Sequence, residues 1–245
     1  MKTHRKFISL PISSVLDDVK TASKGIDFGI EGYPLCDYIM QSVFIKMTGF
    51  QEQKMKCICW ELATHDYDYR YHRFSKEKLG ECSKYDEKTK IYSDLIGQIK
   101  KYRSDFSIIN ESDREVILKK SSSEVEEIFS DSNLSIWAQR KYFDYEKIWE
   151  RIGNGHFASD GKNLLKFMDS GVCLRKVYTN HLYRHRNRIA HNTQSYQHNL
   201  PTLKTLAETD FLYENYFVWF ALLNLIDKIV IHLYSIYIEC LEKDI

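Results

Sequence analysis

A long apolar stretch near the C-terminus, residues 216–238, most constrains how this chain can fold. Its length is sufficient to cross a bilayer as a helix. Four polar side chains interrupt it at roughly one-turn spacing: Asn224, Asp227, Lys228 and His232. Such groups are costly in lipid, whereas inside a protein they can be paired. We therefore expect a buried core helix with one narrow polar stripe, and not a membrane span.

The composition favours long helices over a turn-rich β fold. The 245 residues include only three prolines and ten glycines, and 43% of the residues are hydrophobic. Such a chain can bury a sizeable core and has few breaking residues. Its net charge of +1 indicates no whole-protein attraction to a polyanion, so a nucleic-acid site would have to be local. An all-α fold is predicted.

The cysteines and the N-terminus predict a reduced, cytoplasmic protein. The one close pair, Cys57 and Cys59, has no second pair to complete a zinc site. His65 and His72 lack a clear third ligand, so no metal site is expected. The basic N-terminus is not followed by the apolar segment of a signal peptide.

A second periodic stretch follows Pro34. Apolar residues recur every four positions and continue to residue 62, as the stripe of an amphipathic helix requires. Proline is tolerated in the first turn of a helix. Gly49 weakens the middle by roughly 1 kcal/mol relative to alanine but does not end the helix. Further helices are predicted over residues 91–102, 134–152 and 172–191, with a turn or two of helix at 164–168 and a last helix that starts between 209 and 214.

Other segments are less regular. The first thirty or so residues show no clear periodicity. Tyrosines alternate with charges over residues 65–73, which fits either a strand or an exposed helix, and a helix is favoured. Ser121 followed by Glu124 fits a capping box and predicts a helix start. No repeat or linker marks a second domain, so we expect one helical domain over residues 1–245, in which residues 64–161 form an insertion of unassigned role.

A basic window lies late in the chain. No acidic side chain occurs between Asp169 and Glu208. Its cations are Arg175, Lys176, Arg184, Arg186, Arg188 and Lys204. Such side chains neutralise phosphates, and neighbouring tyrosines can stack on unpaired bases. The window is a candidate RNA-binding surface; a solvated basic face that offsets the dipole of a helix C-terminus is the alternative.

The spacing inside this window suggests chemistry. On a helix, Asn187 and His191 lie four residues apart on one face, with Arg186 adjacent. A guanidinium can hold the non-bridging oxygens of a phosphate and the charge that builds on them. An imidazole can exchange a proton near neutral pH, and an amide can orient it. The three side chains form a set suited to cutting a phosphodiester.

This set resembles the motif of the HEPN superfamily, which has an arginine, a polar residue, three or four spacers and a histidine. The sequence at 186–191 is Arg-Asn-Arg-Ile-Ala-His. Asparagine is the commonest polar residue in catalytic members. The family also has its motif late in the chain, at a helix end, with an apolar helix after it. The resemblance covers residues 33–63 and 162–242.

The resemblance implies a bundle of four or five helices that pairs with a second copy, so that two motifs form a composite active site. It implies a metal-independent endoribonuclease without a cofactor. The ribose 2′-hydroxyl attacks the adjacent phosphate and leaves a 2′,3′-cyclic phosphate and a 5′-hydroxyl, so DNA is a poor substrate. Many relatives are toxins or phage-defence effectors, so we expect RNA as the substrate, a homodimer, and room for an antitoxin or other regulatory partner, with no membrane.

Roles carry over to the matching residues. Arg186 would hold the phosphate and stabilise the transition state, His191 would move the proton, and Asn187 would orient both. The secondary candidates for RNA binding are Arg184, Arg188, Arg175 and Lys176. Some relatives steady the motif with an acidic residue from the first helices, for which Asp37 and Glu61 are candidates.

Two other classes of protein fit the same residues. A non-catalytic HEPN-like module would bind RNA or a partner through the basic window and cut nothing. A helical scaffold with an accidental motif would show no RNA affinity that falls with salt. The reaction products separate the first of these from the enzyme.

Overall fold

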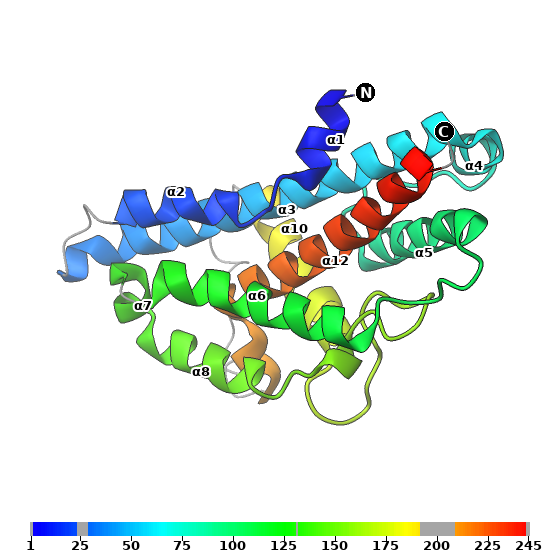
Figure 1. The fold of residues 1–245 in the computed structure, drawn as a ribbon. Coiled ribbons are helices and arrows are strands. Elements are labelled where there is room, and N and C mark those ends of the chain that lie inside the picture. Colours follow the sequence, from blue (N-terminus) through cyan, green and yellow to red (C-terminus); the bar gives the residue numbers. More distant parts are fainter. Residues whose placement is uncertain (1, 24–28, 131, 192–208, 244–245) are drawn as a thin grey trace.

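The computed structural model describes residues 2–23, 29–130, 132–191 and 209–243. Within these ranges every regular element is a helix, and one isolated bridge pairs Phe157 with Leu165. Figure 1 shows helices packed along one another around α12. The predicted all-α class is confirmed.

The α-helices in chain order are α1 (Lys2–Ser9), α2 (Ser14–Ser23), α3 (Tyr33–His65), α4 (Tyr67–Tyr71), α5 (Tyr85–Tyr102), α6 (Glu111–Phe129), α7 (Asn133–Trp137), α8 (Gln139–Trp149), α9 (Leu174–Lys176), α10 (Tyr183–His191) and α12 (Tyr216–Lys243). Short 3-10 helices are η1 (Ile30–Gly32), η3 (Asn154–His156) and η6 (Thr209–Tyr213). Two π-helices are η2 (His72–Lys76) and η4 (Val177–Leu182).

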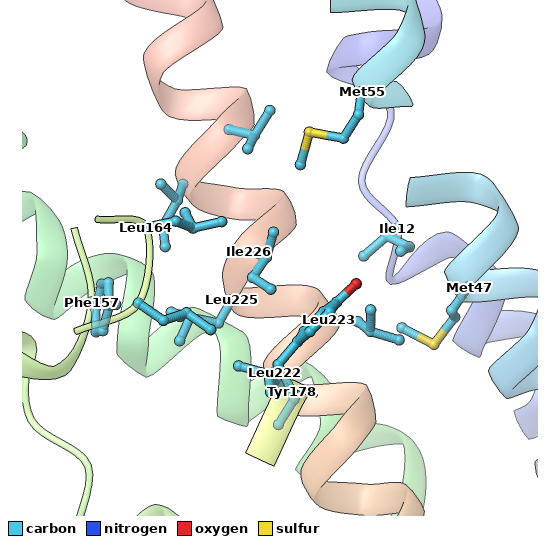
Figure 2. Close-up of a cluster of buried hydrophobic side chains, with 14 of the residues drawn as sticks. Ile12, Met47, Met55, Phe157, Leu164, Tyr178, Leu222, Leu223, Leu225 and Ile226 are labelled. Carbon is cyan, nitrogen blue, oxygen red and sulfur yellow. The ribbon is translucent and has the colours of Figure 1, made fainter. Parts of the chain in front are cut away.

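The core is built around α12, which packs against α3, α5 and α6. Figure 2 shows its leucines between Met47 and Met55 of α3 on one side and Phe157 and Leu164 on the other. By length and apolar composition alone α12 could cross a membrane, yet 78% of its apolar 18-residue window is buried within the fold. The prediction of a buried core helix is confirmed.

The polar residues of α12 find partners on neighbouring helices. Asn224 donates to Glu124 of α6 at 2.9 Å, and the Lys228 ammonium lies 2.5 Å from the same carboxylate. Asp227 instead faces α3. The Asn224 amide nitrogen, Asp227 and Lys228 are thus paired, as most buried polar groups are, while Asn224 Oδ1 is buried without a partner among the described residues. The polar stripe orients α12 between α6 and α3.

The contact between α12 and α3 contains a buried ion pair. Lys54 Nζ lies 2.5 Å from Asp227 Oδ1, and both side chains are at most 1% exposed. The ammonium also donates to the Leu10 carbonyl at 2.6 Å, and Asp227 accepts from the Ile12 amide at 2.9 Å. Burial lowers the pKa of Lys54 and raises that of Asp227, while their mutual attraction opposes both shifts. This cluster joins α3, α12 and the segment between α1 and α2.

α3 has the extent that its periodicity predicts. Pro34 lies in its first turn, and the helix runs through Gly49 for 33 residues. It ends where Asp66 adopts an extended conformation. The Asp66 carboxylate then accepts from the Tyr69 amide at 3.0 Å and caps α4.

Several local predictions are corrected. The capping box at Ser121 is wrong, because Ser121 lies inside α6 and its hydroxyl donates to the Leu118 carbonyl at 2.7 Å. The N-cap of α6 is Asn110, whose side chain accepts from the Asp113 amide at 2.8 Å. The helical turn at 164–168 is also wrong, since that segment contains no helix and its Leu165 takes part in the isolated bridge.

Other helix boundaries lie closer to the predicted ones. The alternating segment 65–73 is helical, as favoured, and the break at Asp66 divides it from α3. The helix predicted over 134–152 is two helices, because Ala138 leaves the helical conformation between α7 and α8. The last helix starts at Tyr216, after a 3-10 turn. The N-terminal residues, which lack clear periodicity, form α1 and α2.

Removing one partner of the buried pair is expected to destabilise the fold strongly. Asp227→Ala leaves the Lys54 ammonium buried without a counter-charge, which costs about 3–5 kcal/mol of unfolding free energy, measured by urea denaturation. Lys54→Met combined with Asp227→Leu removes both charges and should be clearly more stable than Asp227→Ala alone. Asp86→Ala, at a largely exposed carboxylate 3.8 Å from Arg175, is the control and should cost less than about 1 kcal/mol. If Asp227→Ala lowers the unfolding free energy no more than this control does, Lys54 and Asp227 do not form a buried ion pair.

Candidate functional site

The motif lies on a helix whose middle section is a π-helix. α9, η4 and α10 follow one another without a break, because Val177 and Tyr183 at the junctions keep right-handed helical dihedral angles. The Tyr183 amide donates to the carbonyl of Tyr178, five residues earlier, which is the bond of a π-turn. π segments are frequent at functional sites. The helix predicted for this stretch is confirmed.

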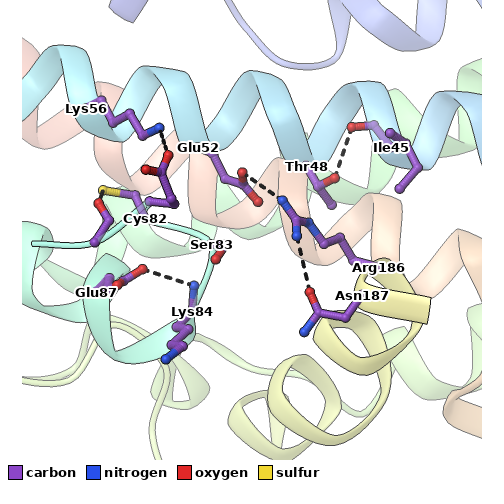
Figure 3. Close-up of polar contacts among 12 residues, drawn as sticks. Ile45, Thr48, Glu52, Lys56, Cys82, Ser83, Lys84, Glu87, Arg186 and Asn187 are labelled. Carbon is purple, nitrogen blue, oxygen red and sulfur yellow. Dashed lines mark hydrogen bonds and ion pairs between the residues drawn. The ribbon is translucent and has the colours of Figure 1, made fainter. Parts of the chain in front are cut away.

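Arg186 and Asn187 are held against α3. Arg186 Nη2 donates to Glu52 Oε2 at 3.1 Å, and Arg186 Nη1 donates to Asn187 Oδ1 at 3.2 Å (Figure 3). The side chains of Arg186 and Glu52 are only 22% and 14% exposed. A guanidinium has five N–H donors, so two contacts leave donors that can bind a phosphate. The arginine is fixed in place and still able to bind an anion.

Two buried polar side chains lie beside this ion pair. The Lys88 ammonium donates to the Cys82 carbonyl at 2.8 Å, and burial lowers its pKa to about 8. The Tyr178 hydroxyl donates to the Ser83 carbonyl at 3.0 Å, and burial raises its pKa. The charge of Glu52 raises the pKa of both groups, and the charge of Arg186 lowers it. Together they anchor the segment around Cys82 and Ser83 next to the motif helix.

His191 is the last residue of α10, and its side chain lies outside the described part of the structure. Asn187 and His191 are four residues apart in one helix and therefore share a side of it. The backbone thus has the arrangement that the motif requires. The convergence of the imidazole with the guanidinium stays a prediction.

Arg188 takes part in a second cluster. Its Nη2 lies 3.2 Å from Glu214 Oε2 and 3.2 Å from His185 Nδ1. Glu214 Oε1 is also 3.0 Å from His181 Nδ1. Burial raises the pKa of Glu214, but the His181 hydrogen bond and the Arg188 charge outweigh burial and lower it. Because Glu214 lies two residues before the first residue of α12, this cluster joins the motif helix to the start of the core helix.

His185 is held inside the fold as a neutral ring. Its Nε2 lies 2.8 Å from the Tyr216 hydroxyl, and its ring packs against Phe44 and Trp219. Burial and the positive charge of Arg188 lower the pKa of His185 to about 4. This histidine therefore packs the motif helix against α3 and α12.

The four candidates for RNA binding differ in their surroundings. Arg184 and Lys176 are exposed and have no ion-pair partner within the described ranges. Arg175 and Arg188 are 38% and 37% exposed, and each lies near a carboxylate. All four therefore reach solvent, and among the residues that the structure describes only Arg175 and Arg188 have a carboxylate nearby.

Acidic side chains from other elements neutralise part of the basic window. Three pairs form: Glu52 with Arg186, Asp86 with Arg175, and Glu214 with Arg188. The window contains no acid of its own, so these pairs arise only when the chain folds. The positive potential of the basic window is therefore weaker than the local sequence predicts.

Neither acidic candidate from the sequence is the carboxylate that pairs with Arg186. Glu61 contacts Arg5 of α1 at 3.4 Å, and Asp37 accepts a hydrogen bond from within α3. The carboxylate that holds Arg186 is Glu52, which the sequence analysis missed. That an acid of the early helices steadies the motif stays a prediction, for which Glu52 is the carboxylate in contact with Arg186.

The arrangement can bind an anion and stabilise negative charge on it. A fixed guanidinium beside an amide suits the oxygens of a phosphate. The residues that the structure describes include no group of three or more His, Cys, Asp or Glu placed to hold a metal ion.

Comparisons with known proteins found no relative. The chain matches no protein-family model, no curated protein and no solved structure. A function must therefore be argued from the residues and contacts above.

The neutral state of His185 predicts a loss of stability in mild acid. An unfolded imidazole titrates near pH 6.5, whereas folded His185 stays neutral down to about pH 4. The unfolded chain therefore binds the proton first, and stability falls as the pH drops from about 6.5 to about 4. This histidine alone should cost roughly 2 kcal/mol by about pH 5.

Urea denaturation at about pH 7 and about pH 5 measures this loss. His185→Gln removes the titrating ring and keeps an amide that can bond the Tyr216 hydroxyl. The variant should lose less stability than the parent between the two pH values. Equal losses for parent and variant contradict a buried neutral His185.

Proposed function

We propose that this protein is a HEPN-type endoribonuclease that cuts RNA without a metal ion, with Arg186, Asn187 and His191 as its catalytic residues. The observation that carries the proposal is the partly buried ion pair between Glu52 and Arg186. It holds the guanidinium beside the Asn187 amide, on the helix that ends at His191. A solvated basic face needs no such arrangement.

The reaction follows from these groups. The ribose 2′-oxygen attacks the adjacent phosphorus, the bond to the 5′-oxygen of the next nucleotide breaks, and a 2′,3′-cyclic phosphate and a 5′-hydroxyl result. One group removes the proton of the 2′-hydroxyl and another protonates the leaving oxygen. His191 suits one of these steps because imidazole exchanges protons near neutral pH. Arg186 would stabilise the charge on the non-bridging oxygens.

A second copy of the chain would complete the site. Two proton transfers require two groups, and one motif has one histidine. Two motifs that meet across a two-fold axis supply both, which agrees with the homodimer that the resemblance implies. The packing of α10 and α12 on α3 supports a bundle of this kind. A role in the cytoplasm as a toxin or phage-defence effector, restrained by an antitoxin or other partner, rests on the resemblance alone.

Cleavage in the presence of a chelator tests the proposal. Purified protein should cut single-stranded RNA under these conditions and leave DNA of the same sequence intact. Arg186→Ala and His191→Ala should each lower the rate at least about 100-fold. Arg151→Ala, at an exposed arginine after α8, is the matched control and should keep the parental rate. Undiminished cleavage by both motif variants overturns the assignment.

Glu52 is a positioning residue in this proposal. Glu52→Ala should lower kcat roughly 10- to 100-fold with little change in KM, because a guanidinium displaced by about 1 Å loses much of its effect. Glu52→Gln keeps an acceptor for Arg186 and should recover part of the rate. Steady-state kinetics of both variants measure kcat and KM, and thermal melts in parallel measure whether the variants stay folded. A rise in kcat for Glu52→Ala means that the carboxylate blocks Arg186 and contradicts the positioning role.

The second candidate function is a non-catalytic HEPN-like module that binds RNA or a partner protein. The observation that favours it is the pairing of three window arginines with carboxylates, which reduces the charge available to a phosphate. Such a module would bind RNA with an affinity that falls with salt and leave it intact. Cyclic phosphate ends on the products exclude it.

A further inference from the structure

A cavity of about 440 Å³ opens between the C-terminal part of α3 and the segment that begins at η2. Trp60, Phe74 and Leu79 line it with apolar surface, and Lys56 and Lys78 add positive charge. Small-molecule sites have volumes of about 300–1,000 Å³. The cavity is therefore large enough for a single nucleotide.

Two aromatic rings of the cavity are open to solvent. Trp60 is 56% exposed and Phe74 is 43% exposed. Their ring centroids are 6.1 Å apart at an interplanar angle of 81°, so the edge of one ring meets the face of the other. Exposed aromatic faces are the surfaces on which unpaired bases stack. The pair forms an L-shaped wall against which a flat base can pack.

The cations of the cavity differ in how firmly they are held. Arg73 donates to both carboxylate oxygens of Asp94, at 2.8 and 2.6 Å, so it is a structural residue. Within the described part of the chain, Lys56 pairs with Glu81 alone, whose side chain is 80% exposed, and such surface pairs are weak. Lys78 is exposed and has no ion pair among the residues described. Lys56 and Lys78 can therefore turn to a phosphate.

The cavity adjoins the proposed catalytic residues. Lys56 lies one helical turn beyond Glu52 on α3, a rise of about 6 Å, and Glu52 holds Arg186. Cys82 lines the cavity. The carbonyl of the next residue, Ser83, accepts a hydrogen bond from the Tyr178 hydroxyl of the motif helix. Figure 3 shows the side chains of Lys56 and Glu52 along the same edge of α3, with the Cys82 segment beneath Lys56.

We propose that this cavity binds one unpaired nucleotide of the RNA strand next to the phosphate that Arg186 holds. The base stacks on Trp60, and Lys56 and Lys78 hold the backbone phosphate. This inference rests on the proposed function and adds the site that would select an unpaired base, because stacking on Trp60 needs a base whose face is free. Single-stranded RNA is the substrate, and a base within a duplex does not enter.

Binding of labelled oligonucleotides tests the cavity without cleavage. In the His191→Ala background, fluorescence anisotropy gives Kd for single-stranded RNA 10-mers and for a duplex of equal length. Trp60→Ala should raise the Kd for the single strand about 5- to 150-fold, as the loss of one stacked base does. Trp60→Phe keeps an aromatic face and should recover most of the affinity. The duplex should bind more weakly and respond little to Trp60.

Phe143 supplies the matched control. It is 53% exposed on α8 and has the Lys147 ammonium 4.1 Å from its ring centroid, so it offers the same chemistry outside the cavity. Phe143→Ala should leave Kd unchanged. A Trp60→Ala value within twofold of its parent, or an equal loss in Phe143→Ala, overturns the cavity as the base site.

The two proposals fail in different ways. If the unaltered chain cuts RNA and Trp60→Ala binds and cuts as the parent does, the cavity assignment fails and the nuclease stands. If the unaltered chain cuts nothing, yet nucleoside 5′-monophosphates and RNA bind in a Trp60-dependent manner, the nuclease fails and the cavity stands. Absence of binding to both probes overturns the cavity assignment.

Discussion

The buried ion pair between Lys54 and Asp227 is the contact on which the arrangement of the other helices depends. The same two side chains bind the carbonyl of Leu10 and the amide of Ile12, so a single cluster joins α3, α12 and the segment between α1 and α2. A buried pair adds little stability over apolar side chains, but its charges must stay satisfied, which few geometries allow. We infer that it fixes the register of α3 against α12.

That register determines which way the rest of α3 faces. Glu52 precedes Lys54 by two residues, about 200° around the helix, and so turns away from α12 toward α10. One turn later on the same side, Lys56 reaches the cavity lined by Trp60. The core contact, the ion pair with Arg186 and the cavity are thus successive features of one rigid helix. The proposed function and the stability of the fold are therefore linked through α3.

Much of the fold follows from the sequence, because long helices with a regular apolar period leave few alternatives. The extent of α3 and the burial of residues 216–238 are of this kind. The sequence does not predict short or locally ambiguous elements correctly: the N-terminal helices, the cap at Asn110 and the non-helical stretch at 164–168. In the site, the local motif could be found, but its partner Glu52 could not, since a salt bridge over 134 positions leaves no local trace. The sign that the sequence offers is the run of four polar residues at 51–54, which interrupts the apolar stripe of an amphipathic helix.

One substitution in the RNA tests most directly the proposal that Arg186 and His191 promote attack by the ribose 2′-hydroxyl. Once a cleavage position is mapped, the nucleotide on its 5′ side is replaced by its 2′-deoxy form in an otherwise identical strand. If the 2′-hydroxyl is the nucleophile, cleavage at that position stops, while binding of the strand and cleavage at other positions persist. Continued cleavage at the deoxy position contradicts the proposal, because no internal nucleophile is then available.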